Sequence, residues 1–265
     1  MEERNLKTWD ELKEELSRLG QEHQKSRGGD WPLLFRGQSN ARWQLATSLD
    51  RRRERMAFRE YYRLIGKIQA QIESLTNVEW EMPEYPEIER RSTEYEFYDD
   101  LWCGKCPGYA YMTYLRHNNF PSPLLDWTRS SSVATFFAFN DCREDSGRVA
   151  IFVYANKENR MHGNGIPMVL RYGPYVKTHP RHFLQQSEYT LCMVFHEEWG
   201  VEKYETVFNE GHHQQGVCWK FTLPATERSK VLLELDQQNV NAFSLFGSED
   251  SMMETLATRE FILAR

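Results

Sequence analysis

The sequence predicts an α+β fold with a mixed or antiparallel sheet and an N-terminal helical region. Amphipathic helical patterns gather in the first half of the chain, and apolar runs of strand length gather in the second half, at 148–154, 191–195 and 217–223. Helices and strands therefore do not alternate as regular βαβ winding requires. The chain has 265 residues, of which 40% are hydrophobic, and this is enough to fill a large core. We expect a single domain over 1–265, with a helical, loop-containing segment at about 50–118.

The first predicted helix spans about 8–20. Thr8 and Glu11 form the pattern of a capping box, in which both side chains bind backbone N–H groups at a helix start. Apolar residues then recur at helical spacing, at Trp9, Leu12, Leu16 and Leu19. Residues 31–36 predict a strand, because Pro32 argues against a helix in so short a run. Gly37 then allows a turn or the close approach of another group.

A second long helix is expected at about 54–78, where one face carries Ile65, Ile68, Ile72 and Leu75. The arginine run at 51–53 is either a solvent-facing helix start or a phosphate-binding patch close behind the strand of Arg36. Residues 79–91 contain two prolines and many glutamates, and predict an exposed loop or linker. A further helical stretch is expected from about 93 to 118.

The segment 121–128, Pro-Ser-Pro-Leu-Leu-Asp-Trp-Thr, predicts a turn or short strand with a restricted backbone. Thr128 or Ser130 then caps a helix that is apolar nearly all round, which we therefore expect to be buried. Its free N–H groups, with Asp126 and the nearby hydroxyls, suit an anion or a phosphate. The alternative is that these side chains only cap the helix. Near the C-terminus, another helix is expected to begin at about residue 229.

Charge and hydropathy argue against a membrane partner and against a long-range attraction to nucleic acids. Thirty-three basic and thirty-nine acidic residues give a net charge of −6. No global field therefore draws the chain to nucleic acids or anionic membranes, and any such contact must be local. No apolar run approaches the length of about 20 residues that a membrane span needs, and the N-terminus lacks a signal-peptide pattern. We expect a cytoplasmic protein with no membrane partner.

The five cysteines are scattered and odd in number, which favours reduced thiols over a disulfide framework. Cys103 and Cys106 have the spacing of half a zinc site, but a closed site needs two more ligands. The pair His212-His213, with Cys218, offers candidates for them. Ordinary thiols are the simpler interpretation, and we expect no bound metal.

Three blocks of residues carry a family resemblance. Phe35-Arg36-Gly37 lies on the first strand, His117 and the 121–128 segment follow a long helical region, and Arg-His-Phe-Leu-Gln-Gln-Ser-Glu-Tyr closes the series at 181–189. In this order they resemble the FRG domain family, which is named for the first word. The chain departs from the family pattern at Arg116, where Gln is usual, at Ser122, where Thr is usual, and at Ser187, where Gly is usual.

The order of the blocks also distantly resembles the ADP-ribosyltransferase layout around NAD. The resemblance implies that Arg36 binds the phosphates through paired, charge-assisted hydrogen bonds. It places Thr128 or Ser130 at the ribose and Gln186-Ser187-Glu188 at the last position. Breaking the nicotinamide–ribose bond builds positive charge on the sugar, which the Glu188 carboxylate would stabilise.

The remaining candidates complete this site. Asp126 would orient Arg36 or activate an acceptor, and His117 would act as a general base. Tyr189 or Trp127 would stack on the nicotinamide ring. With Arg36 and Thr128, the candidate NAD-binding residues are Gly37, Ser130, Gln186, Tyr189 and Arg181.

Each role has a structural alternative. Arg36 and Asp126 can form a buried ion pair that joins sheet to helix. Glu188 can face solvent through strand alternation, His117 can be a core histidine, and Arg181 can bind carbonyl groups of its own chain.

The resemblance implies an NAD-consuming ADP-ribosyltransferase or NAD glycohydrolase, in the setting of a prokaryotic toxin or phage-defence effector. NAD would be a substrate, and another phosphate-bearing small molecule is the wider class of ligand. The acceptor, protein or nucleic acid, is not specified by the sequence. Two alternatives use the same residues: a metal-independent nuclease that acts on RNA, and a non-catalytic module that senses a nucleotide.

Overall fold

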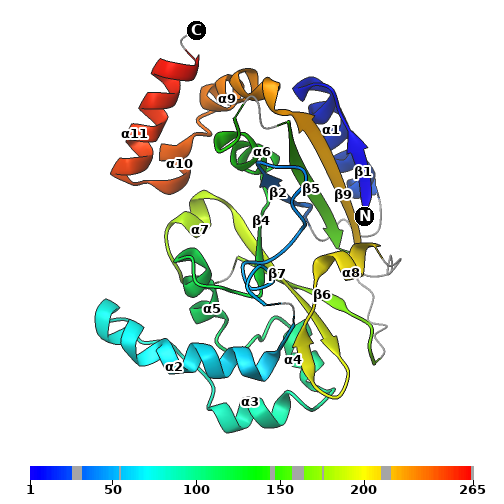
Figure 1. The fold of residues 1–265 in the computed structure, drawn as a ribbon, viewed down its shortest axis with the longest axis vertical. Helices are drawn as coiled ribbons and strands as arrows, with labels where there is room; N and C mark the ends of the chain where they lie inside the picture. The colour runs from blue at the N-terminus through cyan, green and yellow to red at the C-terminus, as the bar shows by residue number, and fades with distance from the viewer. Residues whose placement is uncertain are drawn as a thin grey trace.

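The computed structural model describes residues 1–25, 32–53, 55–143, 147–156, 164–174, 176–209 and 216–263. The described strands form one nine-stranded sheet in the order β1-β9-β5-β2-β4-β7-β8-β3, with β6 paired to β7 (Figure 1). Only the β1–β9 pairing is parallel, and the other described pairings are antiparallel. The expected α+β class with a mixed, mostly antiparallel sheet is confirmed. The strands are β1 Glu2–Asn5, β2 Leu34–Gln38, β3 Met56–Ala57, β4 Leu124–Thr128, β5 Arg148–Asn156, β6 Met168–Tyr172, β7 Ser187–Phe195, β8 Trp199–Val201 and β9 Gly216–Pro224.

Most helices of the described residues lie in two groups, one toward each end of the long axis in Figure 1, and α7 and α8 lie between them. None of them is long and apolar enough to cross a membrane. Their bounds are α1 Trp9–Lys25, α2 Phe58–Thr76, α3 Tyr85–Arg91, α4 Phe97–Trp102, α5 Tyr109–His117, α6 Ser131–Asn140, α7 Arg181–Leu184, α8 Tyr204–Asn209, α9 Arg228–Gln237, α10 Ala242–Phe246 and α11 Glu249–Thr258. Short turns of other helix types follow at Ala225–Glu227 and Arg259–Leu263.

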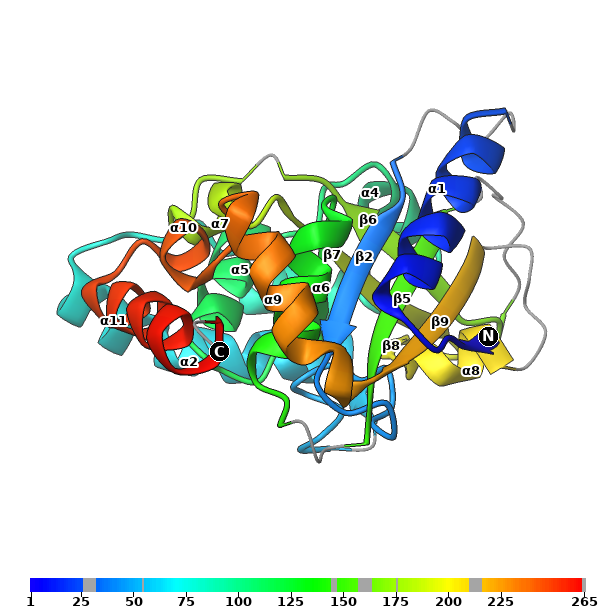
Figure 2. The same ribbon diagram turned by 90° about the horizontal axis from the view of Figure 1, so that it is seen from above.

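Helices α1, α6 and α9 cover one face of the sheet over β2, β5 and β9 (Figure 2). The capping pattern at the start of α1 is present, since the Thr8 hydroxyl accepts a hydrogen bond from the Glu11 N–H. Helix α6 packs so closely on β2 that a Cβ atom at Gly37 would lie 1.9 Å from the Ala134 carbonyl oxygen. Only glycine fits at this position, so Gly37 of the Phe35-Arg36-Gly37 block has a packing role in the fold.

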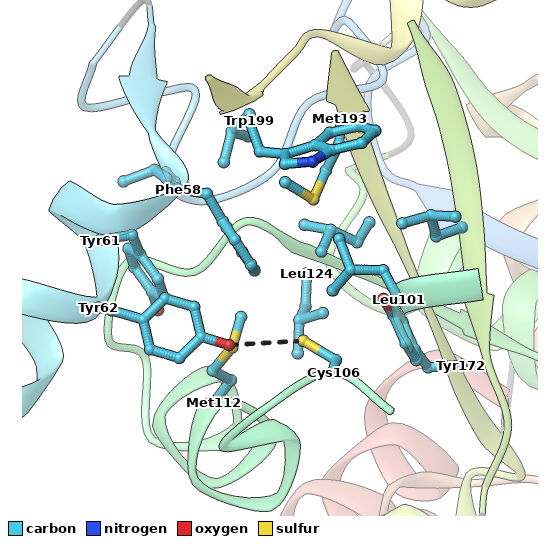
Figure 3. Packing of buried hydrophobic residues seen from close by; sticks show 14 of the residues in the cluster. Phe58, Tyr61, Tyr62, Leu101, Cys106, Met112, Leu124, Tyr172, Met193 and Trp199 are labelled. Atoms are coloured by element: carbon cyan, nitrogen blue, oxygen red, sulfur yellow. Dashed lines mark hydrogen bonds between the residues drawn. The ribbon is translucent and has the colours of Figure 1, made fainter. Parts of the chain in front are cut away.

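Helices α2 to α5 pack on the other end of the sheet around a core rich in aromatic side chains (Figure 3). Phe58 and Tyr62 of α2 form an edge-on pair with ring centroids 4.9 Å apart, and Trp199 of β8 closes the cluster. The Tyr62 hydroxyl lies 3.8 Å from the Cys106 sulfur. Burial of this core holds α5 against the sheet, and α5 carries Arg116 and His117.

Two expectations for the helical region were wrong. Residues 79–91 are not entirely loop, because α3 occupies Tyr85–Arg91. Pro86 lies in the first turn of α3, where a missing N–H costs no hydrogen bond within the helix, and fully buried Ile88 anchors the helix. The stretch 93–118 is not continuous either, since α4 and α5 are separated by a turn in which Gly104 and Gly108 have positive φ angles.

Candidate functional site

A cavity of about 930 Å³ opens beside the central strands. Strand β2 contributes Arg36, β4 contributes Asp126 and Thr128, and α5 contributes Arg116 and His117. Its wall also includes residues of the segment at 39–51, of α6 and of the start of β7, together with Arg181, Gln185 and Phe246 at the end of α10. Segments that are distant in the sequence therefore converge on one hollow.

In the wall of the cavity, Asp126 lies between the side chains of Arg36 and Arg116. Its Oδ2 is 2.9 Å from Nη1 of Arg36, and its Oδ1 accepts hydrogen bonds from Nε and Nη2 of Arg116 at 3.1 and 2.6 Å. Nη1 of Arg36 also donates to the Asp126 backbone carbonyl at 2.7 Å. Burial alone would raise the pKa of this carboxyl, but the charges of Arg116 and Arg36 outweigh it and hold the pKa well below its usual range. Asp126 is therefore ionised, and with 40% of its side chain exposed it keeps acceptor capacity toward the cavity.

Positive charge exceeds negative charge along the cavity wall. Five arginines line it, at positions 36, 42, 51, 116 and 181, against the two carboxylates of Asp126 and Asp141. Burial, and then the charges of Arg36 and Arg116, lower the pKa of Arg51. The buried Nε atoms of Arg36 and Arg181 have no hydrogen-bond partner among the described residues. The wall therefore offers donors and charge to an anion, although the whole chain is acidic.

His117 joins the cavity to a buried chain of hydrogen bonds. Its Nε2 lies 2.8 Å from the Tyr189 hydroxyl, which lies 3.4 Å from Nδ1 of His182. Burial lowers the pKa of His117 to about 4, and burial also lowers the pKa of His182. Burial, helped by the charge of Asp126, raises the pKa of Tyr189 well above its usual value. All three groups are therefore neutral at physiological pH.

Aromatic rings supply the apolar part of the wall. Phe137 of α6 and Phe246 of α10 meet edge to face with ring centroids 5.9 Å apart. The Arg181 guanidinium lies 5.4 Å from the centroid of the Phe246 ring. Trp43 also lines the cavity and is 55% exposed. Such rings can stack on a planar heterocycle.

The hydroxyls at the start of α6 serve the helix itself. The Ser130 side chain caps α6 by accepting from the N–H of Val133 at 3.3 Å. The Thr128 hydroxyl donates to the Gln185 carbonyl at 2.7 Å and accepts from the Ser130 N–H. Thr128 lines the cavity and Ser130 does not. The structural alternative therefore accounts for Ser130.

The structure places Glu188 away from the cavity. Neighbouring residues of β7 point to opposite faces, so Ser187 and Tyr189 line the cavity, whereas Glu188 is fully buried on the other side. There it forms ion pairs with Arg171, at 2.5 Å, and with Arg129. This placement suits a structural anchor and not a group that contacts a ligand in the cavity.

Of the two remaining candidates, Gln186 lies outside the wall of the cavity, whereas Trp127 contributes to the wall but has a buried ring. Gln186 is not among the lining residues, but Gln185 is. Gln186 has a φ angle of 49°, so this residue, not Ser187, takes the conformation typical of glycine. The Trp127 ring packs near Tyr154, and its Nε1 donates to the Thr190 hydroxyl at 2.8 Å.

The cysteine pair shows no zinc geometry within the part of the chain that the structure describes. Cys103 is exposed, whereas Cys106 is buried, and burial raises the pKa of the Cys106 thiol to about 12. No cluster of three or more metal-ligating side chains occurs among the described residues. His212 and His213 lie outside those residues.

Sequence reasoning assigned no role to Arg116 or His182, and it left Arg51 between a solvent-facing helix start and a phosphate-binding patch. Arg116 appeared only as a departure from the family pattern, and Arg51 as part of a charge run. His182 lies in the third block, next to Arg181, and its position there is the signal that would have identified it.

Comparison with known proteins supports the first two blocks. A model of the FRG domain family matches residues 32–147, a segment that includes β2, α5 and β4 but not the block at 181–189. No curated protein and no solved structure matches the chain significantly. Arg36, Arg116, His117 and Asp126 all lie in the matched segment and meet at the cavity. Residues 32–147 of the chain are therefore similar to the FRG domain family.

Proposed function

We propose that the cavity binds a phosphate-bearing nucleotide and that this protein consumes NAD, as an NAD glycohydrolase or an ADP-ribosyltransferase. The observation that carries the proposal is the convergence of five arginines on one hollow in a chain of net charge −6. A guanidinium binds phosphate through paired, charge-assisted hydrogen bonds. The volume, about 930 Å³, lies near the top of the range of about 300–1,000 Å³ that ligand pockets occupy.

The arginines and the aromatic residues of the wall suit different parts of such a ligand. Arg36 and Arg116 are held by Asp126, while Arg51 has no ion pair or hydrogen bond from its side chain among the described residues and is free to bind a diphosphate. The aromatic side chains of Phe137, Phe246 and Trp43 offer stacking surfaces for a base or a nicotinamide ring.

The bond to be broken joins C1′ of the ribose to the nicotinamide nitrogen. Nicotinamide leaves with the bonding electron pair, which neutralises its ring, and positive charge develops on the sugar. The ionised Asp126 carboxylate is suited to stabilise that charge. Water or an acceptor hydroxyl then adds to C1′ and loses its proton to neutral His117. Glu188 has no part in this scheme, because it lies behind the sheet.

The test uses purified protein with NAD and a chelator, with nicotinamide release followed by chromatography and binding of ADP-ribose by calorimetry. Replacement of Arg51 by Ala should weaken binding at least about tenfold, since a hydrogen bond to a charged group contributes about 1.5–3 kcal/mol. Arg52→Ala is the matched control, because Arg52 is a neighbour that does not line the cavity. Absence of both nicotinamide release and ADP-ribose binding would refute the proposal.

A second candidate is cleavage of RNA without a metal ion. The observation that favours it is Trp43, which is half exposed at the cavity and could stack on an unpaired base. His117 would then accept the proton of the 2′-hydroxyl, and the arginines would bind the phosphate. Incubation with single-stranded RNA in chelator separates the two reactions, because only this candidate gives shortened RNA.

A further inference from the structure

Three side chains connect a buried carbonyl group to the cavity. Nε2 of His182 lies 2.9 Å from the Pro174 carbonyl oxygen, Nδ1 of His182 lies 3.4 Å from the Tyr189 hydroxyl, and that hydroxyl lies 2.8 Å from Nε2 of His117. His182 and Tyr189 are fully buried, and their rings are nearly parallel at 8°. Only His117 and Tyr189 reach the cavity wall.

The position of each proton in this series of hydrogen bonds can be assigned by starting from the Pro174 carbonyl oxygen. A carbonyl oxygen only accepts, so His182 must donate from Nε2, and its neutral ring then presents Nδ1 as an acceptor. The hydroxyl of Tyr189 has one proton. If it donates to His182, its oxygen can accept from His117, and both contacts become hydrogen bonds. If it donates to His117 instead, the buried Nδ1 of His182 is left without a donor, which costs free energy.

We propose that His182 and Tyr189 are positioning residues that hold neutral His117 with its proton on Nε2 and the lone pair of Nδ1 free toward the cavity. His117 lines the cavity, and no described residue hydrogen-bonds its Nδ1. Nδ1 is thus the atom that takes up the proton of the attacking water or acceptor. The reaction that uses this base rests on the proposed function, whereas the arrangement of protons does not.

The protein's own histidine signals test the arrangement directly. In ¹⁵N-labelled protein at neutral pH, His117 should carry its proton on Nε2, and that proton should exchange slowly enough with water to give a resolved signal. Tyr189→Phe and His182→Phe should broaden this signal or remove it. His182→Asn, which keeps an acceptor oxygen near the place of Nδ1, should retain it. Tyr172→Phe removes a buried hydroxyl on neighbouring β6 that belongs to no part of the chain of hydrogen bonds, and should leave the signal unchanged.

Kinetics with NAD provide the second measurement. His182→Phe should lower kcat about 10–100-fold and change KM less than about threefold, because the loss concerns proton transfer and not binding. His182→Asn should recover most of kcat. A His117 proton on Nδ1 in the native protein would overturn the inference whatever the activity. A proton on Nε2 with no NAD cleavage would refute the proposed function and leave the hydrogen-bond chain standing.

Discussion

Replacement of Glu188 by Gln removes the negative charge from a buried ion-pair network behind the sheet. The Glu188 side chain is fully buried, and its partner Arg171 is only 3% exposed. Burial already lowers the pKa of Arg171, and the Glu188 carboxylate opposes that effect. Without this carboxylate, a guanidinium charge is left in a place that water hardly reaches.

The size of the effect follows from these contacts. Removal of one partner of a buried ion pair costs about 3–5 kcal/mol. Glutamine keeps the shape and one acceptor oxygen, and Nη1 of Arg171 still donates to the Pro32 carbonyl at 3.0 Å. We therefore expect the lower end, a loss of about 3 kcal/mol in the free energy of unfolding. For a chain of this size the midpoint of thermal unfolding should fall by about 6–12 °C.

Thermal and urea unfolding followed by circular dichroism measure this loss. Glu3→Gln is the matched control, because Glu3 pairs with Lys220 while 49% exposed, and it should change the free energy of unfolding by less than about 1 kcal/mol. At a temperature where both variants are folded, Glu188→Gln should still release nicotinamide from NAD. Unchanged stability together with lost activity would refute the reasoning and return Glu188 to the role implied by the ADP-ribosyltransferase resemblance.

Three further predictions follow from the site and its packing. Asp126→Asn should lower kcat for NAD at least about 100-fold and change stability less than Glu188→Gln, because Asp126 is 40% exposed; equal kcat in variant and native protein would contradict its role. The rate of nicotinamide release should stay constant as the pH falls from neutral and should be half lost near pH 4, where His117 gains a proton. The charged and titratable groups that face His117 are Asp126, Arg116, His179 and His182. A loss of activity centred near pH 6.5 would contradict this prediction, because it would show that His117 titrates as it does in water. Because the pKa of His117 is lower in the folded protein than in the unfolded chain, the unfolded chain binds a proton at a higher pH. The free energy of unfolding should therefore fall as the pH drops from 6.5 toward about 4. Gly37→Ala should destabilise the fold by at least about 1–3 kcal/mol, whereas Gly66→Ala, with open space around it, should not; unfolding midpoints of the two variants decide.

Local sequence patterns were sufficient for the elements that depend on near neighbours. Three patterns that act within a few residues each predicted an element that the structure contains. They are the capping pattern at Thr8 for α1, Pro32 as an argument against a helix before β2, and the apolar run of α6. The break between α4 and α5 was not predicted, because a glycine can also occur inside a helix and Gly104 and Gly108 therefore gave no clear signal of a turn. The resemblance of three blocks also grouped Arg36 with Asp126, and in the structure the two side chains form an ion pair in the wall of one cavity.

The face on which a strand residue lies was decided only by the tertiary structure. A strand pattern fixes that Glu188 and Tyr189 point to opposite sides, but not which of the two sides holds the cavity. The pairing of β7 with β4 and β6 settles this, because it places Tyr189 beside His117 and buries Glu188 beside Arg171. The contacts of His117 with Tyr189 and of Arg36 with Asp126 likewise join residues that are 72 and 90 positions apart in the sequence. Such contacts depend on how the whole chain packs, and short-range spacing carries no record of them.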